Sequence, residues 1–315
     1  MFIVLLLIVL SYGYLKVAIR FKIIDKPNQR SSHTKPTIRG GGIVFVFALL
    51  LFFVLNNYQY PYFVLGVIMI SIISFLDDIY TLSSKIRFPF QLLAILLVLI
   101  EIDLPFIPLY LFIFYLIFGV GIVNMFNFMD GINGITGMYS LAVLSGFYFI
   151  NLNESLVNDE LIYYTVISLL VFGFYNFRKK ALFFAGDIGS ISIGALFFFI
   201  GILFTIKLAS PLILLFVIVY GADSGCTILY RKLFTNENLL EAHRHHMYQK
   251  LVDVKKWSHL RVSFVYAITQ VIINVIIYYS YKLNMNLQLL IFGSLIMLFI
   301  LTYIYLFKIT KINAE

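Results

Sequence analysis

Long apolar runs alternate with short polar segments along the whole of this 315-residue chain. A membrane-spanning helix requires about 20 consecutive apolar residues, and the chain contains about eleven such runs. Their centres lie near residues 10, 49, 69, 94, 114, 143, 168, 197, 218, 270 and 296. The pattern predicts an all-α polytopic membrane protein with about 11 transmembrane helices. Because no segment is left for a soluble domain, we treat residues 1–315 as a single integral-membrane domain.

One polar stretch, residues 124–137, interrupts this pattern with the sequence Asn-Met-Phe-Asn-Phe-Met-Asp-Gly-Ile-Asn-Gly-Ile-Thr-Gly. Its polar side chains recur at every third position, at Asn124, Asn127, Asp130 and Asn133. Non-helical backbone is tolerated at membrane depth only where protein or a water-filled cavity satisfies its polar groups. The stretch therefore predicts a ligand-facing break between two membrane helices.

Composition agrees with this class of protein. Hydrophobic residues make up 62% of the chain and charged residues 12%, and the mean hydropathy is +0.97. Soluble domains contain about 45–50% apolar residues. The net charge is +8, from 23 basic and 15 acidic residues. We attribute this positive charge to the orientation of the protein in the membrane, because basic residues gather in cytoplasmic loops. We therefore expect no nucleic-acid partner. The single Cys226 excludes an intramolecular disulfide.

The distribution of basic residues predicts one orientation. Residues 1–17 are apolar and are followed by Arg20, which favours an uncleaved anchor with its N-terminus outside. The loop 21–39 carries five basic residues against one acid, so we expect it to be cytoplasmic. Alternation then places four further segments inside, at 78–87, 124–134, 177–187 and 228–258. Only Lys207 and Lys282 of the 23 basic residues fall outside, and the C-terminus is cytoplasmic.

In this orientation, the polar side chains within or beside apolar runs all lie at cytoplasmic helix ends: Asp77, Asp78, Asn124, Asn127, Asp130, Asp187 and Asp223. Glycine-bearing turns begin the helices that run outward from the same face, at 40–42, 134–137 and 186–190. A helix N-terminus offers free N–H donors and a positive dipole end, which together form an anion site. Carboxylates beside phosphate donors predict a divalent cation, because Mg2+ is held by one or two carboxylates plus phosphate oxygens. We therefore expect Mg2+, with Mn2+ as the alternative.

Simpler interpretations remain open for these acids. Asp187 is placed to be only a helix N-cap, a position that Asp favours. The adjacent Asp77 and Asp78 close an apolar run, where ionisable residues are functional by default. A solvated loop edge is the alternative for this pair.

Two cytoplasmic loops supply cations suited to a diphosphate. One, residues 241–250, contains His243, Arg244, His245 and His246. A structural zinc site needs four ligands at a defined spacing, so we favour contact with pyrophosphate, with a solvated basic loop as the alternative. The other, residues 30–42, contains Arg30, His33, Lys35 and Arg39, and its alternative is contact with anionic lipid. The role of Asp223 stays open, with structural pairing to Arg231 or Lys232 as one interpretation.

Taken together, the residues resemble the polyprenyl-phosphate N-acetylhexosamine-1-phosphate transferases of glycosyltransferase family 4, which are related to the phospho-MurNAc-pentapeptide translocases. The resemblance covers most of the chain through five ordered motifs: Arg30-x-x-His33 with Lys35-Pro36 and Arg39-x-Gly41-Gly42, Asp77-Asp78, Asn124-x-x-Asn127-x-x-Asp130-Gly131, Gly186-Asp187-x-Gly189-Ser190 with Gly194, and the cluster at 243–246. The string Ala242-His243-Arg244-x-His246-x-Tyr248-Gln249 is most similar to the O-antigen-initiating branch, whose members use UDP-linked N-acetylated deoxyhexoses.

Three positions depart from the family pattern. Asn133 stands where many relatives carry a second Asp, so we assign it no metal role. Ile38 replaces a proline, and Arg244 splits the histidine run. Neither of these two changes removes a charge that the chemistry needs.

The resemblance implies an enzyme that transfers a UDP-activated N-acetylhexosamine-1-phosphate to undecaprenyl phosphate, forming undecaprenyl-pyrophosphoryl-sugar and UMP. This reaction would initiate synthesis of O-antigen or a related cell-wall glycan, with the active site on the cytoplasmic face of a bacterial inner membrane. The implied partners are undecaprenyl phosphate, a UDP-N-acetylhexosamine of the GlcNAc, FucNAc or QuiNAc type, and membrane lipid. A homodimer is left open.

The same resemblance implies residue roles. Asp187 would bind Mg2+, and Asp77 or Asp78 would lie near the attacking lipid phosphate. The implied catalytic set is Asp77, Asp78, Asp130, His243, His245 and His246. The implied substrate-binding set is Arg30, His33, Lys35, Arg39, Asn124, Asn127, Asn133, Asn176 and Arg244.

Two competing functions remain. A secondary transporter or lipid flippase also contains broken helices and buried acids, but its sites lie near the bilayer midplane between repeated halves. Here the acids map to one membrane edge and we find no internal repeat. A homologue without activity is the second competitor, and the intact acids at 77, 78, 130 and 187 argue against it.

Overall fold

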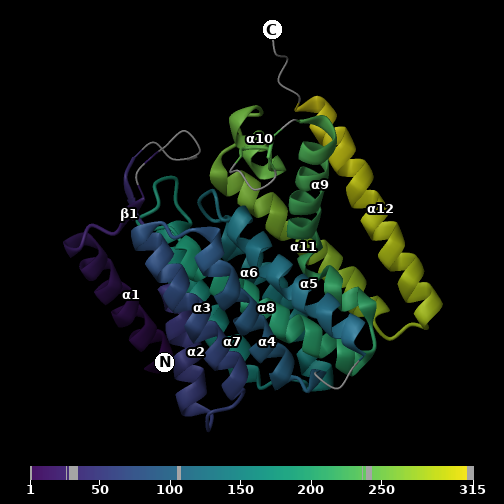
Figure 1. Ribbon diagram of the computed structural model, residues 1–315, viewed down its shortest axis with the longest axis horizontal. Coiled ribbons are helices and arrows are strands. Elements are labelled where there is room, and N and C mark those ends of the chain that lie inside the picture. The colour runs from purple at the N-terminus through teal and green to yellow at the C-terminus, as the bar shows by residue number, and fades with distance from the viewer. Residues whose placement is uncertain are drawn as a thin grey trace.

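The computed structural model describes residues 2–25, 27, 35–104, 108–235, 237–238 and 243–310 (Figure 1). The helices in this part of the chain are α1 (Phe2–Arg20), α2 (Ile43–Leu55), α3 (Pro61–Tyr80), α4 (Ser84–Glu101), α5 (Leu109–Met129), α6 (Ile135–Glu154), α7 (Asp159–Asn176), α8 (Gly186–Leu208), the 3-10 helix η2 (Pro211–Val217), α9 (Ile218–Phe234), α10 (Met247–Asp253), α11 (His259–Ser280) and α12 (Met285–Ile309). Two short strands, β1 (Ile24–Asp25) and β2 (Thr37–Ile38), pair antiparallel.

The described helices agree with the predicted apolar runs. Eight segments are long and apolar enough to cross a membrane: α1, α3, α5, α6, α8, the continuous η2 and α9, α11 and α12. Helices α2, α4 and α7 occupy the remaining three predicted positions. Helix α2 has 13 residues, and at about 1.5 Å per residue it is shorter than a bilayer core. The all-α polytopic class is confirmed, whereas the count of 11 spans and the orientation stay predictions.

Helix α8 lies at the centre of the bundle (Figure 1) and packs against α2, α3, α5 and η2. Residues on every side of it are buried, as expected for a helix that is apolar all round. Its contact with α2 depends on two glycines, because a Cβ added to Gly42 would lie 2.2 Å from the Cα of Gly189. The two backbones touch here without intervening side chains. This contact fixes the start of α8, and therefore Asp187, beside the start of α2.

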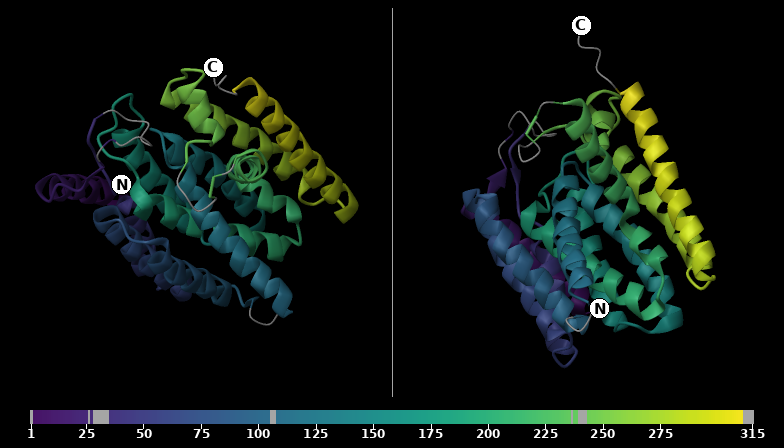
Figure 2. Two further views of the ribbon diagram at one scale, coloured as in Figure 1. Left: turned by 45° about the horizontal axis from the view of Figure 1, so that its top comes forward. Right: turned by 45° about the vertical axis from the view of Figure 1, so that its right-hand side comes forward.

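The helix ends predicted to be cytoplasmic lie together at one end of the bundle. Backbone N–H groups at the start of α8 donate to Asp78 at the end of α3. The Tyr248 hydroxyl of α10 donates to the Phe128 carbonyl near the end of α5. Figure 1 shows β1 and α10 at this end, and Figure 2 shows α1 and α12 on opposite outer edges. The polar residues singled out along the sequence therefore share one face.

The short β1–β2 pair anchors the segment that carries Arg39. Ile24 pairs with Ile38, and the Arg39 N–H donates to the Ile23 carbonyl. Ile38 also forms a parallel bridge to Phe183, which lies just before α8. The N–H groups of Gly41 and Gly42 continue this ladder onto the carbonyls of Phe184 and Ala185. As a result, Arg39 is held directly against the N-terminus of α8.

The junction between η2 and α9 is an irregular segment at membrane depth, and buried polar side chains satisfy its backbone. Gln270 of α11 donates to the Leu215 carbonyl at 3.1 Å and accepts from the Val219 N–H at 3.4 Å. The Tyr139 hydroxyl accepts from the Tyr220 N–H and donates to Gln270 at 2.8 Å. Irregular backbone inside a membrane protein requires such internal partners.

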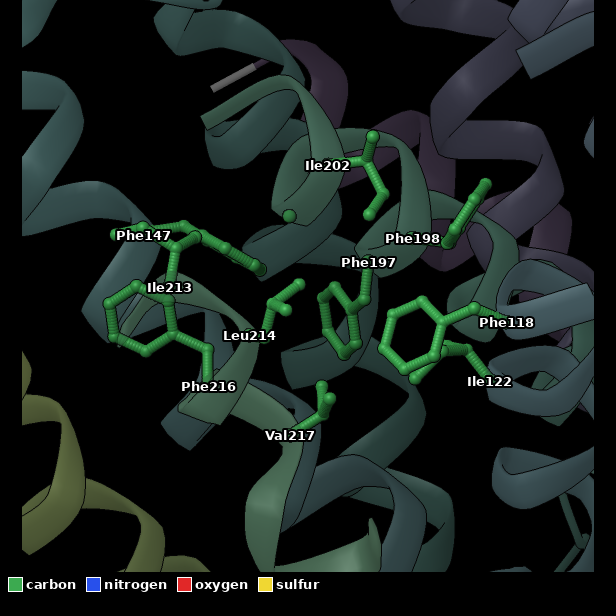
Figure 3. Close-up of a pocket in the computed structure, with 11 residues that line it drawn as sticks. Phe118, Ile122, Phe147, Phe197, Phe198, Ile202, Ile213, Leu214, Phe216 and Val217 are labelled. Atoms are coloured by element: carbon green, nitrogen blue, oxygen red, sulfur yellow. The ribbon is translucent and has the colours of Figure 1, made fainter. Parts of the chain in front are cut away.

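An apolar cavity of about 20 Å³ lies among α5, α6, α8 and η2 (Figure 3). The aromatic rings of Phe118, Phe147, Phe197 and Phe216 form much of its wall. Its lining offers no charged side chain to a phosphate, so this cavity is a packing defect of the core and carries no candidate chemistry.

Candidate active site

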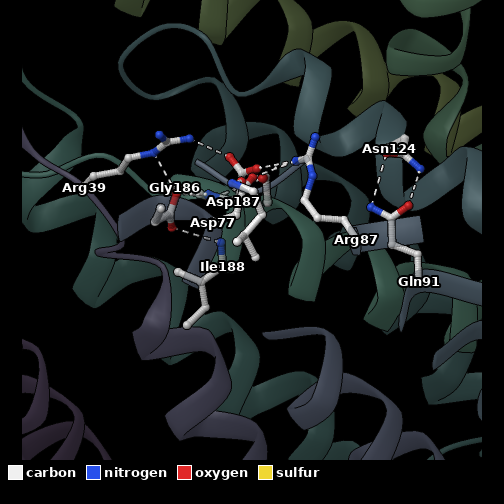
Figure 4. A network of polar contacts seen from close by, with 11 residues as sticks. Arg39, Asp77, Arg87, Gln91, Asn124, Gly186, Asp187 and Ile188 are labelled. Carbon is white, nitrogen blue, oxygen red and sulfur yellow. Dashed lines mark hydrogen bonds and ion pairs between the residues drawn. The ribbon is translucent and has the colours of Figure 1, made fainter. Parts of the chain in front are cut away.

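Three aspartates gather at the shared end of α3 and α8 (Figure 4). Arg39 bridges two of them, with Nε 2.7 Å from Asp78 Oδ1 and Nη2 2.7 Å from Asp187 Oδ1. Arg87 bridges Asp77 and Asp187, with Nη1 2.8 Å from Asp77 Oδ2 and 3.0 Å from Asp187 Oδ2. Asp187 is therefore held between two guanidinium groups. We call these five residues the acid–arginine cluster.

The two adjacent aspartates of α3 have different tasks. Asp77 accepts the Leu82 N–H and so closes the C-terminal turn of α3. Asp78 reaches across to α8, where it accepts the Asp187 N–H at 2.9 Å and the Ile188 N–H at 3.3 Å. Free N–H groups at a helix start are usually capped by a preceding side chain, and here the cap comes from another helix. The interpretation of Asp187 as a mere N-cap is therefore wrong, because Asp78 does that work.

The acid–arginine cluster has a donor set that fits Mg2+. Three carboxylates against two guanidiniums leave a formal charge of −1, which favours a further cation. Mg2+ takes one or two carboxylates and fills its remaining positions with phosphate oxygens and water. Arg87 Nη1 already lies between the Oδ2 atoms of Asp77 and Asp187, where positive charge neutralises both. Among the described residues, no group of three or more His, Cys, Asp or Glu side chains is arranged to hold a metal ion by itself.

The predicted break is present between α5 and α6, where Asp130 to Gly134 leave the helical conformation. Gly134 has a φ of 86°, a value that glycine adopts without steric cost. Asp130 accepts a hydrogen bond of 2.6 Å from the Thr136 hydroxyl. Asn127, one turn earlier, directs its buried Nδ2 toward the carboxylate of Asp187, although the contact falls outside ordinary hydrogen-bond geometry. This amide extends the acid–arginine cluster to the end of α5, and its direct contact with substrate stays a prediction.

The other predicted asparagines bind protein partners that account for their polarity. Asn124 and Gln91 of α4 exchange hydrogen bonds of 2.9 and 3.3 Å (Figure 4). Asn133 Nδ2 donates to the carbonyls of Arg178 and Lys179. Asn176 accepts the Gly134 N–H at 2.7 Å and donates to the Phe183 carbonyl. Asn133 and Asn176 hold the break in shape, and Asn124 joins α5 to α4. Direct contact of the three amides with substrate stays a prediction.

The histidine loop packs under the same end of the bundle. His243 stacks near His246, with ring centroids 4.9 Å apart. Burial, together with the charges of His246 and Arg231, lowers the pKa of His243 to about 4. His245 lies farther out and pairs with Glu237 at 2.9 Å. Of the three predicted histidines, His243 and His246 are therefore the ones turned toward the interior.

Arg244 and Asp223 both bind protein partners at or near the histidine loop. Arg244 forms a forked pair with Asp253, with contacts of 2.8 to 3.1 Å. Asp223 makes no pair with Arg231 or Lys232, so that interpretation is wrong. It accepts hydrogen bonds from the His246 ring and from the start of α10. The reason is distance along α9: Arg231 lies eight residues after Asp223, about 12 Å along the helix axis, and binds Glu237 and Asn238.

A basic pocket of about 530 Å³ opens beside the break. Its walls include the cations Lys35, Lys179 and Lys180 and the ring of Phe184, together with Asn133 and His259. Sequence reasoning placed Lys179 and Lys180 only as markers of the inner face and missed Phe184 and His259. The proximity of Phe184 to Asp187 in sequence was the available signal. Arg30 and His33 lie outside the described residues, so their predicted roles have no structural counterpart.

The fold and the site define an all-α membrane protein that gathers carboxylates, guanidiniums and a basic pocket at one end of its helices. Residues 60–205 match the family described as glycosyl transferase family 4. This range includes Asp77, Asp78, the break and Asp187. Together with the relatives below, the match supports a relationship to the polyprenyl-phosphate N-acetylhexosamine-1-phosphate transferases.

Three relatives define the comparison. The "Probable undecaprenyl-phosphate N-acetylglucosaminyl 1-phosphate transferase" of Bacillus subtilis (strain 168) is 28% identical, over 80% of this chain and 76% of the relative. The undecaprenyl-phosphate alpha-N-acetylglucosaminyl 1-phosphate transferase of Thermotoga maritima is 25% identical, over 77% and 78%. The phospho-N-acetylmuramoyl-pentapeptide-transferase of Streptococcus suis (strain 05ZYH33) is 32% identical over 49% of each chain.

Proposed function

We propose that the protein transfers the N-acetylhexosamine-1-phosphate group of a UDP-sugar to undecaprenyl phosphate, releasing UMP. The observation that carries this proposal is the acid–arginine cluster, which joins three carboxylates and two guanidiniums at the N-terminus of α8. Phosphoryl transfer needs mainly positioned charge, and this cluster supplies charge of both signs at one point. The Bacillus subtilis and Thermotoga maritima relatives, which align over most of their length, are named for undecaprenyl phosphate as acceptor and N-acetylglucosaminyl 1-phosphate as transferred group. Both names support the proposed acceptor and an N-acetylhexosamine-1-phosphate as the transferred group.

The basic pocket is the proposed site of the UDP portion. A nucleoside diphosphate presents two phosphates and a flat base, and the pocket offers three lysines and one aromatic ring. Lysine side chains attract phosphate, while an aromatic face stacks on a base. Lys35 lies four residues before Arg39, which belongs to the acid–arginine cluster. One short segment therefore contributes to both the nucleotide pocket and the cluster.

The proposed reaction requires no net proton transfer. A phosphate oxygen of undecaprenyl phosphate attacks the sugar-bearing phosphorus of the UDP-sugar, and the bond from that phosphorus to the bridging oxygen breaks. The four negative charges of the two dianionic reactants become two on the lipid pyrophosphoryl sugar and two on UMP. The attacking phosphate has a second pKa of about 6, so it is largely deprotonated at neutral pH. Asp77 or Asp78 would then orient the acceptor more than deprotonate it.

The remaining residues hold charge during this exchange. Asp187, with Asp77 or Asp78, would hold Mg2+, which would neutralise phosphate oxygens. Arg39 and Arg87 fix the carboxylate of Asp187 on both of its oxygens. The amide of Asn127 lies beside Asp187 and adds one further donor next to that carboxylate. Preorganised donors of this kind act mainly where charge develops in the transition state.

The finer assignments belong to the same proposal. We infer that the reaction takes place at the cytoplasmic face of a bacterial inner membrane and initiates synthesis of O-antigen or a related glycan. UDP-linked GlcNAc, FucNAc and QuiNAc are the donors to test. Transport is the alternative function, but the acids lie at one end of the helices and not between repeated halves at the midplane, so we do not favour it.

Purified protein incubated with undecaprenyl phosphate, Mg2+ and each UDP-sugar in turn should release UMP with at least one donor. Asp187→Asn should lose nearly all turnover. Asp103→Asn is the matched control, because Asp103 is exposed at the far end of α4 and its positive φ of 57° suits Asn. If no donor yields UMP, or if UDP is released instead, the proposed reaction is wrong.

A further inference from the structure

Asp223 is a buried carboxylate outside the acid–arginine cluster, and it receives an unusual number of hydrogen bonds. Its side chain is fully buried on α9. It accepts the backbone N–H groups of Met247 at 3.0 Å and Tyr248 at 3.1 Å, at the start of α10. It also lies 3.1 Å from Nδ1 of His246 and accepts the Tyr266 hydroxyl of α11. One carboxylate thus joins α9, α10 and α11 at the histidine loop.

This environment fixes the proton of the His246 ring. A carboxylate accepts hydrogen bonds and donates none, and the other partners of Asp223 are all donors. The ring nitrogen that faces it, Nδ1, must therefore carry a hydrogen. The second nitrogen, Nε2, faces away from Asp223 and has no hydrogen-bond partner within the described residues. The partner of one ring nitrogen determines the chemistry of the other.

The His246 ring lies near the break between α5 and α6. The His246 ring centroid is 6.4 Å from that of Phe128, two residues before Asp130. Tyr248 packs directly against the break, because a Cβ added to Gly131 would lie 2.1 Å from the Tyr248 hydroxyl. His246 itself is 4% exposed. The ring is therefore locked by packing on its faces and by Asp223 on one edge.

We propose that Asp223 is a positioning residue that holds His246 with Nδ1 protonated, so that Nε2 contacts the diphosphate of the donor. This inference rests on the proposed function. When the diphosphate is bound, Nε2 carries a proton and donates it in a hydrogen bond to a phosphate oxygen, and Asp223 serves as the counter-ion of the charged ring. Among the described residues, the other titratable groups whose rings pack on His246 are His243, with centroids 4.9 Å apart, and Tyr248, at 5.7 Å.

A first experiment tests the orientation without using activity. Nitrogen NMR of protein labelled at its five histidines, with His246→Gln to assign the signal, reports which ring nitrogen of His246 carries the proton. The wild-type ring should show the Nδ1–H form in the absence of ligand, and UDP should add the Nε2 proton. A wild-type His246 in the Nε2–H form would overturn the proposal even if the Asp223 variant failed to fold.

A second experiment separates positioning from a purely structural role in capping α10. Asp223→Asn should lower kcat about 10- to 100-fold, as for other residues that orient a functional histidine, with a smaller change in KM. His246→Ala should lower kcat about 10²- to 10³-fold. If Asp223 acts through His246, the double variant should be no slower than His246→Ala alone. Multiplied losses would show that Asp223 only supports the fold.

Tyr266→Phe is the matched control for this second experiment. It removes one donor from Asp223 but leaves the contact with His246, so its kcat should stay within about threefold of wild type. A loss as large as that of Asp223→Asn would assign the effect to the buried network as a whole and refute the specific role of the His246 contact. If the wild-type protein releases no UMP, the proposed function fails, while the NMR result still decides the orientation of His246.

Discussion

Replacement of Gly42 by alanine should damage the site without changing any polar side chain. Gly42 has an ordinary φ of −69°, so its role is one of space alone. An added Cβ would lie 2.2 Å from Gly189 Cα and 2.9 Å from the Ala185 carbonyl oxygen, and both are backbone atoms that cannot rotate away. Ordinary contact begins at 3.4 Å, so the starts of α2 and α8 must separate by 1.2 Å.

The cost of this separation follows from packing and from site geometry. Overpacking of a close contact costs about 1–3 kcal/mol, which should lower the melting temperature by a few degrees, on the order expected for a chain of this size. The larger effect should be on turnover. Asp187 lies at the start of α8 and Arg39 lies just before α2, so separation of the two helices displaces these side chains relative to each other. A misplacement of about 1 Å can cost 10²-fold in rate.

Gly121→Ala is the matched control for Gly42→Ala. Gly121 lies in α5, and an added Cβ there meets nothing within 4 Å, so this variant should keep its melting temperature and activity. Thermal unfolding in detergent and initial rates of UMP release measure the two quantities. A Gly42→Ala protein with wild-type stability and kcat would refute the claim that the bare backbone contact positions the site.

Three further predictions concern the metal, the pH dependence and the topology. Asp187→Asn should abolish the stabilisation of the protein by Mg2+ in the presence of UDP, as measured by thermal shift; an unchanged shift would exclude Asp187 as a ligand. UDP should bind more tightly as the pH falls from 8 to 6, because a bound diphosphate favours a proton on Nε2 of His246, whereas burial and the charge of His246 hold the pKa of His243 near 4 and keep that ring neutral; calorimetry in buffers of different ionisation enthalpy measures the proton uptake, and its absence contradicts the assignment. Single cysteines in 151–160, on a Cys226→Ser background, should react with impermeant reagents from outside, whereas those in 80–86 should not; the reverse pattern would invert the orientation.

The sequence predicted those features of the fold that depend on local pattern. Apolar runs located the helices, and the polar spacing in residues 124–137 located the break that the structure has between α5 and α6. Placing Asp77, Asp78 and Asp187 at the same helix ends also predicted their meeting. In each case the length of a helix and its direction were sufficient, because a side chain at a helix end lies near that end whatever the rotation of the helix.

Partners that depend on helix rotation could not be predicted. Asn124 pairs with Gln91, a residue of another helix that no sequence pattern singles out. Asp223 likewise pairs with His246, which lies on another element 23 residues later in the chain. Helices that are apolar on all sides carry no hydrophobic stripe to show which face turns inward. Arg87 is a related case: its charge indicated an inner loop, but its bridge between Asp77 and Asp187 required the packing of α4 on α3.

The central claim is that a sugar and its phosphate move together to the lipid. A UDP-N-acetylhexosamine labelled with ³²P in the sugar-linked phosphate, incubated with the protein, undecaprenyl phosphate and Mg2+, tests this claim most directly. The label should pass into the lipid fraction in proportion to the UMP released, and Asp187→Asn should prevent the transfer. Label that stays in the aqueous phase as UDP while sugar reaches the lipid would contradict the account, because the bond broken would then be the one between sugar and phosphate.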